Sequence, residues 1–339
     1  MESLTPTPGA VPKRGGRGRT LFRVAVSAAL IAWILRGTDL REVLATFRTA
    51  DVRYILIAIG LIPIGYLSSV SRWQILLRAQ GGDASFGFLT RSLMTGIFFN
   101  NLLPSTIGGD AIRAWDTARS GVSRGTALTI IVVDRFVGLL ALLLFAAIGL
   151  LGATRLNEQA PELAFWVIGV GAVMIVAAAL LFLPSSHGPD LLARLGARLP
   201  GKWGALPGKV AEALFAFQGK GRALAGAFFW SLCLQTMVVL NAWVTARALR
   251  IELGLAPFFL MIPLAVFVMM IPVSINGIGV RENLFVFFFA ALGVAEASGL
   301  AFAWLEYGLL LLQALAGGVV YAISGRGRSE RSIPVEVAP

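Results

Sequence analysis

The chain has 339 residues, of which 57% are hydrophobic and 14% are charged, and its mean hydropathy is +0.80. Soluble globular domains carry about 25% charged residues, so this composition excludes that class and indicates an all-α polytopic membrane protein. The net charge of +11 comes mostly from Arg and Lys beside apolar segments, which is typical of cytoplasmic loops near anionic lipid and not of a nucleic-acid-binding domain.

The N-terminal part combines a polar tail, an apolar run and an amphipathic stretch. Residues 1–20 are basic and rich in Pro and Gly, and we expect them to be a disordered cytoplasmic tail. Residues 21–35 are apolar without a clear cleavage site, so they are predicted to be an uncleaved first span. Residues 38–50 place apolar side chains at i, i+3, i+4 and i+7, which predicts a helix on the membrane surface.

The next two apolar segments differ in length. Residues 54–77 are long enough for a second span, and Arg72 and Trp73 near its end fit an interfacial anchor. An Arg72 that faces the helix bundle is the functional alternative. Residues 88–103 are too short for a span, which needs about 20 apolar residues, so a re-entrant or half-length helix is predicted.

The remainder of the chain repeats this pattern of long and short apolar segments. Long spans are predicted at residues 126–153, 163–183, 223–246 and 300–323. Shorter segments at 258–271 and 284–294 flank an interruption. The total is about 6–8 transmembrane helices plus two re-entrant or broken helices. The membrane domain is expected over residues 21–324, with halves of about 21–153 and 163–324, a cytoplasmic loop at 184–221 and a polar tail at 325–339.

The first interruption is a polar stretch, N-N-L-L-P-S-T-I-G-G-D-A-I-R, at residues 100–113. Irregular polar backbone at membrane depth survives only where protein buries it or where it lines a wet cavity. Proline ends a helix, and paired glycines permit backbone geometry that turns amide groups inward. The candidate binding residues are Asn100, Asn101, Ser105, Gly108, Gly109, Asp110 and Arg113, with Pro104 as a structural residue.

The second interruption, at residues 272–282, shares the framework P-x-x-I-x-G-x-x-x-R with the first, at a constant offset of 168 residues. Broken segments in corresponding halves indicate the binding site of a transporter with inverted repeats. The candidate binding residues here are Asn276, Gly277, Gly279, Arg281 and Glu282, with Pro272 as a structural residue.

These residues suit an anionic headgroup. The N-terminus of a helix that begins near Asp110 attracts anions, and Arg113 and Arg281 are expected to approach one phosphate from opposite halves. Asp110 and Arg113 are also spaced for an i, i+3 pair. The alternative is that both stretches are ordinary turns with interfacial arginines.

Three further ionisable residues lie within predicted spans. Asp134 is expected to pair with a motif arginine, and Arg135 to face a lipid headgroup or the substrate, although an interfacial pair is the alternative. Glu306 follows Trp304 and is expected either to bind substrate or to lie at the interface. Sequence patterns for a catalytic or metal site are absent, so no cofactor and no enzymatic activity are expected.

The distribution of Arg and Lys predicts the topology. The N-terminal tail, the segment 78–125 and the loop 184–221 are basic, so they should be cytoplasmic, as should the C-terminus. Residues on both sides of the first short segment are then cytoplasmic, so the number of membrane crossings between them must be even. The chain at residues 88–103 must therefore enter the membrane and return on the same side. Two short spans in residues 257–295 would fit the parity as well as a second re-entrant element.

The stretches N-N-L-L-P-S-T-I-G-G-D-A-I-R (100–113), D-R-F-V-G-L (134–139) and P-V-S-I-N-G-I-G-V-R-E (272–282) resemble the flippase-like, lysylphosphatidylglycerol-synthase transmembrane-region family. The resemblance covers nearly all of residues 20–325 and implies a helical inner-membrane protein. In full-length synthases such a domain moves an aminoacylated phospholipid between leaflets, and a separate soluble domain makes it. A short tail follows residue 323, so aminoacyl transfer is not expected. The segment Asn276 to Gly279 departs from the glycine pair common in the family.

The leading functional hypothesis is a translocator of a membrane phospholipid or polyprenyl-linked lipid. The alternative is a non-transporting membrane partner of a glycosyltransferase or envelope-lipid synthesis complex, docked through residues 184–221. A third hypothesis, an integral-membrane enzyme acting on lipid phosphate, is disfavoured because the motifs contain no histidine. The sequence does not predict the oligomeric state.

Overall fold

The structure is a computed structural model, and it describes residues 40–102, 107–152, 168–169, 171–172, 212–213, 215–270, 274 and 276–326. Every regular element in these ranges is a helix, which confirms the predicted fold class. The helices are α2 (Leu40–Arg48), α3 (Val52–Ala79), α4 (Phe86–Leu102), α5 (Ile107–Ala118), α6 (Arg124–Gly152), α11 (Gly221–Ala248), α12 (Phe258–Met269), α13 (Val280–Ala291) and α14 (Glu296–Arg326).

Four of the described helices, α3, α6, α11 and α14, are long and apolar enough to cross a membrane. Each candidate segment has 28 or 29 residues, and 28 residues of α-helix extend about 42 Å, beyond the ~30 Å hydrocarbon core. The helices α5, α12 and α13 have 12 residues each, so at about 18 Å they cannot cross. The predicted span 21–35 lies outside the described residues, as does 163–183 apart from 168–169 and 171–172.

The helices form two series with the same order of long, short, short and long elements. The first series is α3, α4, α5 and α6, with 28, 17, 12 and 29 residues. The second is α11, α12, α13 and α14, with 28, 12, 12 and 31 residues. The two polar interruptions therefore occupy the same place in each series, between its two short helices.

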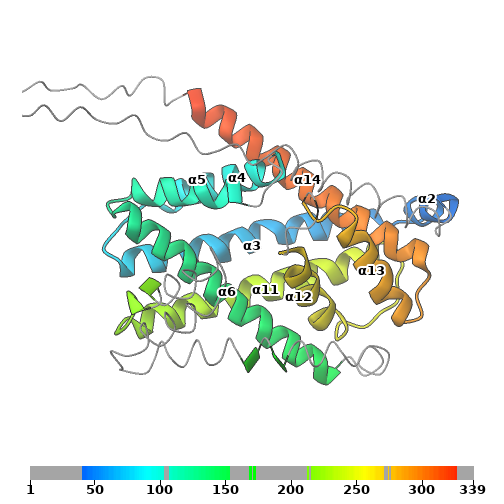
Figure 1. Cartoon of the computed structure of the whole chain (residues 1–339). Coiled ribbons are helices and arrows are strands. Elements are labelled where there is room, and N and C mark those ends of the chain that lie inside the picture. The colour runs from blue at the N-terminus through cyan, green and yellow to red at the C-terminus, as the bar shows by residue number, and fades with distance from the viewer. Residues whose placement is uncertain are drawn as a thin grey trace, which may run out of the picture.

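The first helices of the two series, α3 and α11, run side by side in opposite directions (Figure 1). Near one end, Asn241 Nδ2 donates to the Ala58 carbonyl at 2.7 Å, and near the other end Lys220 Nζ donates to Gln80 Oε1 at 2.8 Å. Equivalent helices of opposite direction make the two series an inverted repeat, as the sequence indicates.

The helices α4 and α5 form a hairpin whose two ends meet. The Asp83 amide, just before α4, donates to the Ser120 carbonyl, just after α5, at 3.1 Å. The chain thus enters and leaves this hairpin at the same end of α3, which is the re-entrant arrangement that charge parity predicts. The hairpin α4–α5 lies toward one end of the α3–α11 pair, and α12 and α13 lie toward the other end (Figure 1).

Each series packs one of its short helices against the final long helix of the other series: α4 contacts α14, and α12 contacts α6. Glycines allow both contacts. A side chain at Gly317 of α14 would overlap the backbone of Met94, and one at Gly149 of α6 would overlap the backbone of Leu260. These glycines are 168 residues apart, the same offset that relates the two interruptions.

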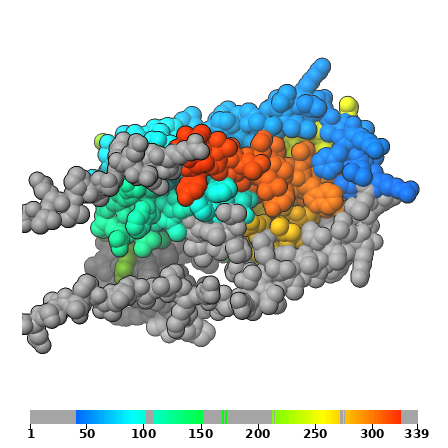
Figure 2. All heavy atoms as spheres, turned by 90° about the horizontal axis from the view of Figure 1, so that it is seen from above, coloured from blue at the N-terminus to red at the C-terminus, as the bar shows by residue number. Residues whose placement is uncertain are grey.

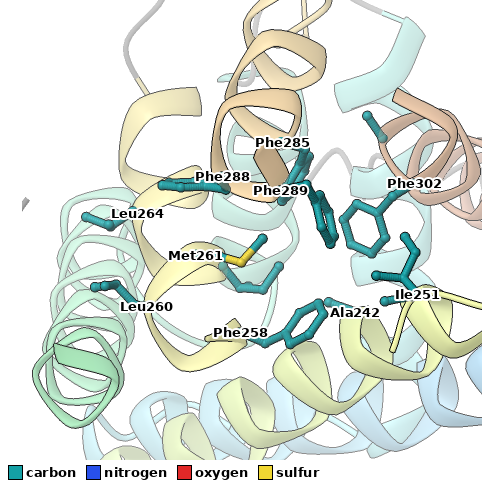
Figure 3. Packing of buried hydrophobic residues seen from close by; sticks show 14 of the residues in the cluster. Ala242, Ile251, Phe258, Leu260, Met261, Leu264, Phe285, Phe288, Phe289 and Phe302 are labelled. Carbon is teal, nitrogen blue, oxygen red and sulfur yellow. The ribbon is translucent and has the colours of Figure 1, made fainter. Parts of the chain in front are cut away.

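Aromatic side chains fill the core of the second series. Phe258 from α12, Phe285 and Phe289 from α13 and Phe302 from α14 converge, and the Phe285 and Phe302 ring centroids lie 4.9 Å apart (Figure 3).

The predicted amphipathic helix is α2, which contacts α14 and buries Val43 in this core. Figure 2 shows α14 in orange to red across one face, beside α2 and α3 in blue.

The close approach of α14 to α4 predicts that Gly317→Val destabilises the protein. The added side chain has to displace backbone, and overpacking of this kind costs about 1–3 kcal/mol. Thermal unfolding in detergent should show a lower melting temperature than the wild type. Gly308→Val on the same helix is the matched control, because nothing lies within 4 Å of an added Cβ there; equal stability of both variants would contradict the close contact.

Candidate functional site

A fully buried carboxylate, Asp134 on α6, lies at the centre of the first cluster of charges. Arg72 on α3 binds it in a fork, with Nε to Oδ1 at 2.6 Å and Nη2 to Oδ2 at 3.1 Å. The third guanidinium nitrogen of Arg72 donates to Ser231 Oγ on α11 at 3.0 Å. Bidentate pairs of this type are strong and directional, so one arginine ties together α3, α6 and α11.

Arg113 on α5 is the second arginine on this carboxylate. Its Nη2 lies 3.2 Å from Asp134 Oδ2, which confirms the predicted pairing of Asp134 with a motif arginine. Its guanidinium carbon also lies 4.5 Å from the centre of the Trp73 ring, and Trp73 Nε1 donates to Thr117 Oγ1 at 3.1 Å. Arg113 Nε is buried without a hydrogen-bond partner. Arg113 is therefore held in place but keeps one donor unused.

The neighbouring pair is Asp110 on α5 and Arg135 on α6. Arg135 Nε lies 3.2 Å from Asp110 Oδ2, and its Nη2 contacts the other oxygen of the same carboxylate. The expected i, i+3 pair of Asp110 with Arg113 is therefore wrong, because each of these side chains has a partner on α6 instead. Arg135 remains about half exposed, so it can still contact a lipid headgroup.

The charges of the first cluster do not balance. Arg72 and Arg113 share the single carboxylate of Asp134, while Arg135 and Asp110 neutralise each other. Among these five side chains, positive charge exceeds negative charge by one. Buried charges are costly unless a partner compensates them, so this cluster favours an anion.

The first interruption is held together by close backbone contact. Asn100 Oδ1 accepts the Gly109 amide at 2.7 Å, and Asn101 Nδ2 donates to the Ile97 carbonyl at 3.0 Å. A Cβ at Gly109 would overlap both the Gly96 carbonyl and the Asn100 side chain. The glycine is therefore required by the approach of α4 to α5.

Two details of the first interruption differ from expectation. The helix α5 begins at Ile107, before the predicted start near Asp110, and both Gly108 and Gly109 belong to it. Gly109 therefore serves close packing instead of unusual backbone geometry. Pro104 and Ser105 lie outside the described residues, as does Pro272 of the second interruption.

The second interruption does adopt unusual backbone geometry. Asn276, Gly277 and Gly279 have φ values of 50°, 74° and 85°, in the left-handed region where glycine is favoured. Asn276 Nδ2 donates to the Asn101 carbonyl at 3.0 Å. The two interruptions, 175 residues apart at this contact, therefore meet inside the bundle.

Arg281 and two acids form the second cluster of charges. Glu282 accepts the Gly279 amide at 2.6 Å through one oxygen and lies 2.9 Å from Arg281 Nη2 through the other. The Arg281 guanidinium carbon lies 4.3 Å from the centre of the Tyr307 ring on α14. Glu306 interacts with Arg281 and with Thr245 of α11. Arg281 Nε and Glu306 Oε1 are buried without hydrogen-bond partners.

The candidate residues thus gather in two clusters with opposite charge. Arg113 belongs to the first cluster and Arg281 to the second, and each is paired with an acid of its own series. In the described residues no ion pair joins the two clusters. That both arginines bind one phosphate stays a prediction. Among the residues that the structure describes, no group of three or more His, Cys, Asp or Glu side chains is placed to hold a metal ion.

Sequence reasoning missed several members of these clusters. The preferred interpretation of Arg72 as an interfacial anchor is wrong, because its side chain is 8% exposed and faces Asp134. The signal was present, since an arginine inside an apolar span is a functional candidate by default. Ser231, Thr245 and Tyr307 carried no such signal, because single hydroxyl groups are common in membrane helices.

Several known proteins are similar to this chain over most of its length. A UPF0104 membrane protein of Pyrococcus horikoshii is 22% identical over 305 residues, which cover 84% of this chain and 90% of the relative. A UPF0104 membrane protein of Methanothermobacter thermautotrophicus is 24% identical over 301 residues, 83% of this chain and 87% of the relative. The glycosyltransferase AglD of Haloferax volcanii is 25% identical over 342 residues, 89% of this chain but only 55% of that protein.

Residues 20–317 match the family described as the lysylphosphatidylglycerol synthase transmembrane region. The match covers the helices α2 to α13 and most of α14, including both interruptions and both clusters. With its apolar spanning helices and its inverted repeat, the chain is a multi-pass membrane protein that belongs to the family of the lysylphosphatidylglycerol synthase transmembrane region.

Proposed function

We propose that this protein translocates a lipid with an anionic headgroup, an anionic phospholipid or a polyprenyl-linked glycan, across the cytoplasmic membrane. The observation that carries the proposal is the excess of one positive charge among the five described side chains of the first cluster, beside the first interruption. Arg113 is 6% exposed, shares its carboxylate with Arg72 and keeps an unused donor at Nε. A phosphate supplies both the missing charge and the missing acceptor.

The architecture around this charge favours a lipid that is transported, and not a lipid that stays bound as part of the structure. The hairpin α4–α5 carries Arg113, and its helices of 17 and 12 residues are too short to cross the membrane fully. The second hairpin, formed by α12 and α13, meets it through Asn276 and Asn101. Inverted repeats with broken helices are typical of proteins that expose one site to each side in turn. In this structure Arg113 and Arg72 are both nearly inaccessible to solvent, so a headgroup requires the hairpin to move.

A second candidate function follows from one relative. AglD is named a glycosyltransferase, and this chain matches only 55% of its length. A membrane domain of this type therefore occurs in a larger protein named for glycosyl transfer. On that basis the alternative is that this chain is a membrane partner of a glycosyltransferase without translocating lipid itself.

The excess positive charge predicts a specific effect of Arg113→Gln. The change leaves Arg72 and Asp134 as a neutral pair, so the variant should fold, while the headgroup loses a charged hydrogen bond of about 1.5–3 kcal/mol. The apparent affinity for fluorescent phosphatidylglycerol in nanodiscs should fall roughly 10- to 150-fold. The rate of flipping in proteoliposomes, measured by chemical quenching of the outer leaflet, should fall as well.

The matched control is Arg119→Gln, which removes the same charge from an exposed position on the same cytoplasmic segment. This variant should bind and flip the lipid as the wild type does. Unchanged binding in Arg113→Gln, or an equal loss in both variants, would contradict the headgroup site. Wild-type protein that binds but never flips lipid would favour the partner alternative.

Asp134→Asn tests the buried ion pairs independently of any lipid. It leaves two buried guanidinium groups without a carboxylate, and the loss of one partner of a buried pair costs about 3–5 kcal/mol. Thermal unfolding in detergent should show a marked loss of stability. Asp83→Asn is the control, because Asp83 forms an exposed pair with Arg78 that contributes about 1 kcal/mol or less. Similar melting temperatures for the two variants would show that Asp134 does not hold the helices together.

The proposed orientation places both termini and residues 78–125 in the cytoplasm, because these segments are basic. Since α3 and α11 are antiparallel, the loop after α11 should then be extracellular. In a Cys233→Ser background, an impermeant thiol reagent should label Glu252→Cys and not Ser85→Cys in intact cells. Both positions are exposed in the structure, so the reverse pattern would invert the topology.

A further inference from the structure

Glu306 is an acid within a membrane helix, and one of its two carboxylate oxygens has no hydrogen-bond partner. It lies on α14, one of the four helices that can cross the membrane. Its Oε1 is shielded from solvent and accepts no hydrogen bond. Thr245 and Arg281 are the groups that interact with it. An ionised carboxylate in such a place is costly unless something neutralises it.

Arg281 does not provide that neutralisation, because it is already paired. Its Nη2 lies 2.9 Å from Glu282, whose other oxygen accepts the Gly279 amide at 2.6 Å. The second cluster therefore has two carboxylates for one guanidinium, the opposite of the first cluster. One added positive charge would balance it.

Among the described residues, no cation other than Arg281 is found to interact with Glu306. Of the described helices that contact α14, α13 presents Arg281 and Glu282. The helix α11 presents Thr245, while its Arg247 lies over the Trp243 ring, and α3 presents Tyr66, which donates to Gln313. The charged side chains of α2 and α4 are exposed: Arg41, Glu42, Arg48 and Arg91. On α14 itself, the neighbouring Tyr307 lies against the Arg281 guanidinium.

We propose that Glu306 is a proton-binding site, and that uptake and release of its proton accompany each cycle of the membrane domain. Protonation converts the carboxylate, whose Oε1 has no hydrogen-bond partner, into a neutral carboxyl group and leaves Arg281 to Glu282 alone. Deprotonation makes Glu306 compete with Glu282 for the same guanidinium. No bond other than the carboxyl O–H forms or breaks, and the proton exchanges with water.

The competition for Arg281 links this proton to the point where the two hairpins meet. Glu282 holds the Gly279 amide, and Asn276, three residues earlier, donates to the Asn101 carbonyl of the first hairpin. A shift of Arg281 toward Glu306 therefore loosens the second interruption at its contact with the first. The coupling of the proton to lipid movement rests on the proposed function, whereas proton binding itself does not.

Infrared difference spectroscopy of the full chain in nanodiscs tests the proton site directly. Spectra recorded between alkaline and acidic buffer should show the carbonyl band of a buried protonated carboxyl group. The band should be lost in Glu306→Gln, retained at a shifted frequency in Glu306→Asp and unchanged in Glu296→Gln, an exposed acid at the start of the same helix. Absence of the band in the wild type, or its persistence in Glu306→Gln, would overturn the proposal, as would a change driven by sodium at constant pH.

A second measurement separates this inference from the proposed function. In proteoliposomes, a pH gradient should change the rate at which the wild type flips fluorescent phosphatidylglycerol, and should leave Glu306→Gln unaffected. If the infrared band behaves as expected but no flipping occurs, the lipid-translocation function fails while the proton site stands. If flipping occurs with equal gradient dependence in both proteins, the coupling role of Glu306 is refuted.

Discussion

The arrangement of this bundle depends on the buried carboxylate of Asp134. Two arginines from different helices bind it, and one of them extends to a serine on a third helix, so a single ionised group fixes the positions of α3, α5, α6 and α11. Burial of so many charges is tolerated only with close, directional partners. The remaining positive charge explains why this end of the bundle is suited to an anion, and the fork geometry explains why arginine is used instead of lysine.

The second constraint is that each half packs one of its short helices against the last long helix of the other half. Because α4 packs on α14 and α12 packs on α6, neither half buries its own re-entrant helix completely. Gly149 and Gly317 permit these contacts at equivalent places. The two series share the order of their helices but differ in chemistry, since the first cluster has more arginines than acids and the second has more acids than arginine.

Much of this architecture was predictable from the sequence. The length of each apolar segment and the charge of each loop can be read locally, and together they limit how many times the chain crosses the membrane. The pairing of Asp134 with a motif arginine was also predictable, since an isolated acid at membrane depth requires a partner. Which arginine completes the pair was not predictable: Arg72 comes from a helix 62 residues away, and its position near a helix end fitted an anchor equally well. The role of Gly109 was missed for a related reason, because close approach between helices has no local signature that distinguishes it from a flexible turn.

The contact between Asn276 and Asn101 has a kinetic consequence. It joins the two interruptions at the point where the short helices of the two series meet. A neutral hydrogen bond of this kind contributes only about 1 kcal/mol, which slows its opening by less than an order of magnitude. The contact between the two interruptions is therefore weak compared with the buried ion pairs of Asp134.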